Sequence, residues 1–187
     1  MRDSTKITVG YQFWYIFLMQ LAAIGITLVF GLVAFWYFLN IKVVKELISV
    51  VFMAVNFAML YIASKKLAQR DCKPYTPLKP NVFKGAMFGV MISAVTLVLM
   101  LLFKYVWNNY SDETGINGVI PIIINILFYC WSFPYTGIMG LYNGNFMVYS
   151  GIIMLILPIA ATLTGYVAGC KNIEIAEKLD KFIYEKE

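Results

Sequence analysis

The side chains that most often carry out chemistry are scarce in this chain of 187 residues. It contains no histidine, so the group that exchanges protons most readily near neutral pH is absent. Its three cysteines, Cys72, Cys130 and Cys170, form no CxxC motif, whereas structural metal sites are built from clustered ligands. Half of the ten acidic residues fall in the segment 171–187. We therefore expect no catalytic residue, no cofactor and no metal site.

Polar side chains inside apolar stretches are the remaining candidates for functional residues, because such side chains are energetically costly in a membrane and are often functional. They are amides and hydroxyls, and three amides stand out: Gln20, Asn56 and Asn125. Neither type of group titrates at physiological pH, which disfavours a pump built on a buried carboxylate relay. The amides either line a polar cavity for a neutral solute or join neighbouring helices by hydrogen bonds, at about 0.6 kcal/mol each. The sequence leaves both roles open.

The elements that must position these side chains are strongly apolar. The chain is 61% hydrophobic and 13% charged, whereas soluble domains are about 45–50% apolar and about 25% charged. Crossing a bilayer core of ~30 Å takes about 20 helical residues. Charge-free runs of that length predict an all-α integral membrane protein with a single transmembrane domain, a bundle of four full transmembrane helices. Their expected bounds are about 11–39, 43–64, 85–107 and 147–169.

A fifth apolar stretch, 119–133, is short and is bounded by Pro121 and Pro134. We favour a re-entrant or short membrane segment here, because irregular backbone at membrane depth is tolerated where protein covers it. A full fifth span is the alternative, and it would place the segment 171–187 on the opposite side of the membrane. That segment has the apolar spacing of an amphipathic helix.

Basic residues set the expected orientation. The segment 65–84 has a net charge of +5, the same as the whole chain, and Asp71 is its one acid. Loops rich in lysine and arginine remain in the cytoplasm, so we expect a multi-pass protein of the cell membrane with this loop and the N-terminus inside. The basic side chains are expected to contact anionic lipids of the inner leaflet, and we expect no nucleic-acid partner. They are Lys65, Lys66, Arg70, Lys73, Lys79 and Lys84.

Small residues at a spacing of four mark two helix faces that allow close packing in a membrane. The first face comprises Gly85, Gly89 and Ser93, and the second comprises Ala161, Gly165 and Gly169. We expect these faces to pack on neighbouring helices, and contact between the two faces is one such arrangement.

Three local patterns resemble a group of small, uncharacterised polytopic membrane proteins of Gram-positive bacteria. They are Gln69-Arg70-Asp71 with Lys84-Gly85 opening the next span, Phe133-Pro134-Tyr135, and Gly165-Tyr166 followed by Gly169-Cys170-Lys171 and the Glu177-Lys178 tail. They cover about a third of the chain. The resemblance implies no activity, but it implies that the basic segment and the tail share the cytoplasmic side.

The leading functional hypothesis is a non-enzymatic membrane component, either an accessory or an interaction protein, with a second copy or another membrane protein as its partner. The alternative is a small-solute transporter subunit that uses the three amides as its polar lining. In size and basic charge the chain is similar to the substrate-binding subunits of energy-coupling-factor vitamin transporters. Those are bundles of six helices, whereas this sequence has four or five plausible spans.

Overall fold

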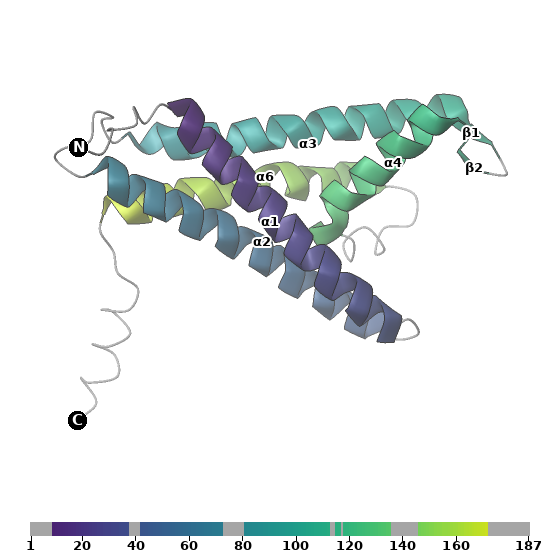
Figure 1. The fold of residues 1–187 in the computed structure, drawn as a ribbon, viewed down its shortest axis with the longest axis horizontal. Coiled ribbons are helices and arrows are strands. Elements are labelled where there is room, and N and C mark those ends of the chain that lie inside the picture. Colours follow the sequence, from purple (N-terminus) through teal and green to yellow (C-terminus); the bar gives the residue numbers. More distant parts are fainter. Residues whose placement is uncertain are drawn as a thin grey trace, which may run out of the picture.

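Four long helices dominate the computed structural model, which describes residues 9–37, 42–72, 81–112, 115–116, 118–135 and 146–171. Each is apolar enough, over a sufficient length, to cross a membrane, so the structure has the four long apolar helices that the sequence predicted. They are α1 (Val9–Tyr37), α2 (Lys42–Asp71), α3 (Val82–Tyr110) and α6 (Phe146–Cys170) (Figure 1).

The expected fifth membrane segment is α4 (Val119–Ser132), which continues into the short 3-10 helix η1 (Phe133–Tyr135). Its 14 residues rise about 21 Å at 1.5 Å each, less than the thickness of a bilayer core. In Figure 1, α4 starts beside the end of α3 and runs back toward the middle of the bundle. These features are consistent with a short or re-entrant segment.

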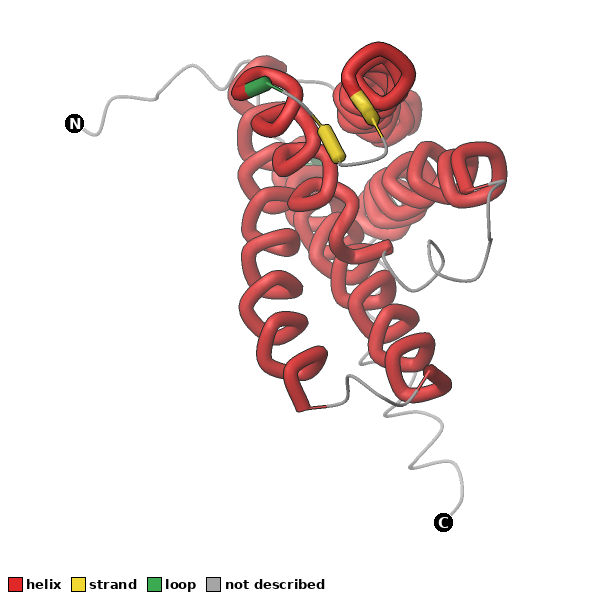
Figure 2. Tube along the Cα trace, turned by 90° about the vertical axis from the view of Figure 1, so that its right-hand side faces the viewer, coloured by secondary structure: helices red, strands yellow, loops and turns green. Residues whose placement is uncertain are grey.

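A tight hairpin joins α3 to α4. The two-residue strands β1 (Ser111–Asp112) and β2 (Gly115–Ile116) pair antiparallel, and Gly118 follows with a φ of 101°, which favours glycine because it has no Cβ. Figure 2 views the molecule from the end that carries these strands. The hairpin reverses the chain, so that α4 packs along α3 instead of leading away from it.

The four long helices meet at the other end of the bundle, at the left of Figure 1. The N-terminal ends of α1 and α3 and the C-terminal ends of α2 and α6 lie there together (Figure 1). We call this region the Asp71 end, after the last residue of α2. The end of α6 thus lies at the same end of the bundle as the start of α1, which is consistent with four spans and a segment that turns back.

The second helix is longer than the sequence predicted. It continues through Lys65–Asp71, so that about the first third of the expected loop 65–84 is helical, and α3 takes up the last residues of that segment. The extension persists because Leu67 and Ala68 are buried, at 4% and 0% exposure, while Lys66 and Arg70 lie on the exposed face. The expected helix of the segment 171–187 lies almost wholly outside the described residues.

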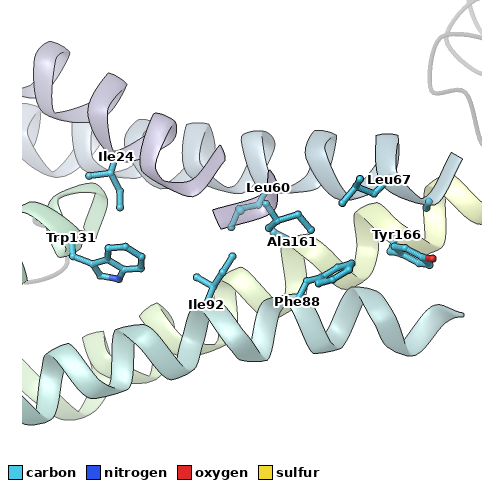
Figure 3. Packing of buried hydrophobic residues seen from close by; sticks show 10 residues of the cluster. Ile24, Leu60, Leu67, Phe88, Ile92, Trp131, Ala161 and Tyr166 are labelled. Atoms are coloured by element: carbon cyan, nitrogen blue, oxygen red, sulfur yellow. The ribbon is translucent and has the colours of Figure 1, made fainter. Parts of the chain in front are cut away.

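The core is centred on α6, which packs between α2 and α3. Leu60 of α2, Phe88 and Ile92 of α3, and Ala161 and Tyr166 of α6 belong to one buried cluster, shown in Figure 3. In Figure 3, α6 passes between the other two helices, and Tyr166 lies at the end where α2 finishes. This packing brings the tip of α2 against the starts of α1 and α3.

Candidate functional site: a buried carboxylate where four helices meet

Asp71 is the centre of the most polar cluster among the described residues. It is 2% exposed, although its chain neighbours Arg70 and Cys72 are both exposed. Gln12 Nε2 donates a hydrogen bond to Asp71 Oδ1 at 2.6 Å. Lys84 Nζ donates to Oδ2 at 3.0 Å, and Tyr166 Oη donates to the same oxygen at 2.7 Å.

The three donors come from α1, α3 and α6, so one carboxylate links the ends of all four long helices. Burying a charge without partners is strongly unfavourable, whereas a paired and hydrogen-bonded charge is tolerated. The side chain of Asp71 is 0% exposed and that of Lys84 is 15% exposed, so the ion pair is largely shielded from water. Each of these two charges can therefore remain buried only while the opposite charge lies beside it.

Local helix preferences oppose both charges of this ion pair. Acidic side chains are favoured near helix N-termini and basic ones near C-termini, because of the helix dipole. Asp71 is instead the last residue of α2, and Lys84 lies in the first turn of α3. The contacts between helices, and not the local sequence, must therefore fix the positions of these two residues.

Two thiols border the cluster. Cys72 is exposed, and Cys170 at the end of α6 is partly buried. Cys72, Asp71 and Lys84 lie near enough to the Cys170 thiol to interact with it electrostatically. The structure thus brings together two cysteines that lie 98 positions apart in the sequence. The third cysteine, Cys130, lies on a different helix, α4.

The face formed by Gly85, Gly89 and Ser93 lies against α6. A Cβ atom added to Gly85 would lie 2.6 Å from Tyr166 Cβ, and one added to Gly89 would overlap the backbone of Ile159. Ser93 Oγ donates to the Leu155 carbonyl at 2.6 Å. The helices approach so closely here that only small side chains fit between them.

The second small-residue face packs on α2. Gly165 lies against the backbone of Tyr61, and a Cβ added to Gly169 would be 2.5 Å from the Lys65 carbonyl. Ala161 is in the buried core cluster. Gly85 and Gly89 thus pack on α6, and Gly165 and Gly169 pack on α2, so the two glycine pairs contact different helices.

The three amides singled out from the sequence lie on three different helices. Gln20 of α1 and Asn56 of α2 are 1% and 0% exposed, and Asn56 Nδ2 donates to Tyr135 Oη at 2.9 Å. Asn125 is half-buried on α4. Each amide has a buried side-chain oxygen without a hydrogen-bond partner in the described part of the chain.

The basic side chains divide into two groups. Lys84 differs from the expectation of lipid contact, because its ammonium group is bound to Asp71. Lys66 and Arg70 are exposed and Lys65 is half-buried, all on the last turns of α2. Lys73 and Lys79 lie outside the described residues.

Sequence reasoning missed the Asp71 cluster, although its spacing left a signal. On α2, Ser49, Asn56, Ser64 and Asp71 are all buried at intervals of seven or eight, which places them on one helix face. Gln12 and Gln20 repeat at an interval of eight on α1. Two polar stripes at that spacing predict two helices that pack through polar groups.

Two of the three motifs behind the resemblance meet at this site, since Asp71, Lys84, Tyr166 and Cys170 belong to them, whereas Phe133-Pro134-Tyr135 lies after α4. Comparison of the chain with family models, curated proteins and solved structures gives no significant match. In the ranges that the structure describes, no group of three or more cysteine or acidic side chains could hold a metal ion. The local chemistry is thus a shielded ion pair, two donors and two thiols.

Proposed function

We propose that this protein is a non-enzymatic component of the cell membrane, an accessory or interaction protein whose Asp71 end faces the cytoplasm. The observation that carries the proposal is the engagement of Asp71 by three donors from three other helices. A carboxylate used in this way holds helix ends in place. The cluster therefore supports a fixed scaffold whose interactions occur at its surface.

The helical extension of α2 supports a basic surface at that end. Leu67, Ala68 and Asp71 anchor the extension to the bundle, and Lys66 and Arg70 lie on its exposed side. Each basic side chain near an anionic leaflet contributes about 1 kcal/mol of attraction. A rigid helix that presents such charges suits contact with inner-leaflet lipids and with the acidic surface of another membrane protein.

The orientation can be tested with single-cysteine variants in whole cells. A chain that retains only Cys72 should react with a membrane-impermeant maleimide after permeabilisation and not before. The matched control is Asn108→Cys in a cysteine-free chain, because Asn108 is exposed at the opposite end of α3 and should react in intact cells. Labelling of Cys72 from outside would reverse the proposed orientation.

The interaction role is tested by purifying the protein from its native membrane and identifying what copurifies. We expect a defined partner, or a second copy, at constant stoichiometry. The Lys66→Glu/Arg70→Glu variant should weaken this association, whereas Lys104→Glu should not, because Lys104 is exposed near the other end of α3. A monomer without a partner in either sample would contradict the interaction role.

A small-solute transporter subunit is the second candidate. It is favoured by the buried oxygens of Gln20, Asn56 and Asn125 that have no partner among the described residues. An amide oxygen accepts hydrogen bonds, so each of the three could bind a donor group of a solute. Uptake that depends on the protein and falls in both Gln20→Leu and Asn125→Leu would favour this candidate over the first.

A further inference from the structure

The thiols at the Asp71 end belong to two helices held firmly together. The Cys72 amide donates to the Ala68 carbonyl at 3.0 Å, and the Lys171 amide donates to the Val167 carbonyl at 3.0 Å. These bonds keep both cysteines on the regular helix path. Cys170 lies one helical turn after Tyr166, whose hydroxyl donates to Asp71, the neighbour of Cys72, so the two thiols lie at adjoining helix ends.

Glycine lets the two helix ends come this close. A Cβ added to Gly169 would lie 2.5 Å from the Lys65 carbonyl and 2.6 Å from Ala68 Cβ. A disulfide requires Cα atoms roughly 4.4–6.8 Å apart and Cβ atoms that approach each other. Close backbone packing one residue before Cys170 brings the two cysteine-bearing helix ends together.

The two thiols also differ in access in the way that exchange chemistry requires. Cys72 is exposed and Cys170 is partly buried, so a reagent in solution reaches Cys72 first. The neighbouring Cys170 can then attack the product from within the protein. An exposed thiol beside a second, resolving thiol is the arrangement found in redox-responsive cysteine pairs.

We propose that Cys72 and Cys170 form a modification site that takes low-molecular-weight disulfides, of which glutathione disulfide is the type. The Cys72 thiol loses its proton to solvent and attacks one sulfur, which forms a mixed disulfide and releases one thiolate of the reagent. The Cys170 thiol then loses its proton and attacks Cys72 Sγ, which releases the second thiolate. The two protein thiols are oxidised by two electrons, and the reagent is reduced to two thiols.

The product joins the last turn of α2 to the end of α6 beside the Asp71 cluster. In a reducing compartment the dithiol is the resting form. A rise in the concentration of low-molecular-weight disulfides then forms the Cys72–Cys170 disulfide. Closure covalently fixes two of the four helix ends that Asp71 links by hydrogen bonds. The modification therefore acts at the Asp71 end, beside the basic surface.

Thiol counting on the full-length protein tests the proposal. The reduced protein in detergent micelles, dilute enough to suppress contacts between copies, is treated with glutathione disulfide, denatured and tagged with a mass-shifting maleimide. We expect the number of tagged thiols to fall from three to one, with the tag on Cys130 and with no retained glutathione. The Cys130→Ser variant should fall from two to zero.

The two serine variants identify the order of events. Cys170→Ser should retain glutathione on Cys72, because the resolving thiol is missing. Cys72→Ser should react far more slowly, because Cys170 is less accessible. Three persisting thiols in the wild type, a stable glutathione adduct on wild-type Cys72, or a disulfide only between two copies would each overturn the proposal.

Discussion

The two halves of the bundle use glycine and polar side chains differently. At the Asp71 end, Gly165 and Gly169 lie against the backbone of α2, and the buried carboxylate is fully engaged. In the opposite half, Gly31 faces the ring of Phe133 and Gly151 faces the flexible end of Met100. Buried oxygens of Asn56 and Asn125 lack partners there among the described residues; at the Asp71 end the Gln12 oxygen also lacks one, but its amide nitrogen donates to the carboxylate.

The difference shows where the structure can adjust. Backbone packed against backbone cannot move aside without shifting whole helices, whereas a methionine or phenylalanine side chain can change its rotamer. Aromatic contacts contribute to the packing in the opposite half, where the ring centroids of Phe103 and Phe128 lie 4.3 Å apart. We therefore expect mutations at the Asp71 end to be costly and comparable mutations in the other half to be mild.

Loss of the central carboxylate should have the largest effect. Asp71→Leu leaves the Lys84 ammonium shielded without its partner, and breaking such a pair costs about 3–5 kcal/mol. Because 15% of the Lys84 side chain is exposed, we expect Asp71→Leu to lower the free energy of unfolding by about 3 kcal/mol. The measurement is reversible unfolding in mixed micelles, followed by circular dichroism.

The double variant Asp71→Leu/Lys84→Met is the control for this prediction. It removes both charges together and should recover a large part of the lost stability, because no uncompensated ion remains. If the double variant were as unstable as the sum of the two single variants, the ion pair would not be the cause. Asp71→Leu with wild-type stability would refute the central role of the cluster.

A methyl group added to a glycine should give the next largest effect. Gly165→Ala forces a Cβ into the backbone of Tyr61, and overpacking of this kind costs about 1–3 kcal/mol. Gly151→Ala meets only the end of the Met100 side chain, so it should cost much less. Melting temperatures of the two variants in one detergent measure the contrast directly.

Gly25→Ala is the matched control for both glycine variants, because nothing lies within 4 Å of a Cβ added there. Alanine has a higher helix propensity than glycine, so this variant should melt at or above the wild-type temperature. Equal melting temperatures for Gly165→Ala and Gly151→Ala would remove the proposed contrast between the two halves.

The sequence was directly informative about the apolar helices but gave only an indirect signal of the Asp71 cluster, for a physical reason. A span is a local property, because every residue in a run of about 20 must be compatible with lipid. The partners of Asp71 are 59, 13 and 95 positions away from it. In the sequence, Asp71 is a single acid among lysines, and only the packing of α6 between α2 and α3 reveals what surrounds it.

The smallest expected effect concerns the hydrogen bond between Asn56 and Tyr135 in the opposite half. Tyr135→Phe removes the hydroxyl that accepts from Asn56 Nδ2, and hydrogen bonds between membrane helices average about 0.6 kcal/mol. We expect a loss of about that size in the same unfolding assay, well below the loss for Asp71→Leu. The double variant Asn56→Leu/Tyr135→Phe should be nearly neutral, because it removes both partners of the hydrogen bond together with an oxygen that has no partner in the described residues. If the loss of stability in either variant were comparable to that of Asp71→Leu, the polar groups of this half would be as strongly engaged as the carboxylate. Such a loss would argue that Asn56 holds a bound solute or water.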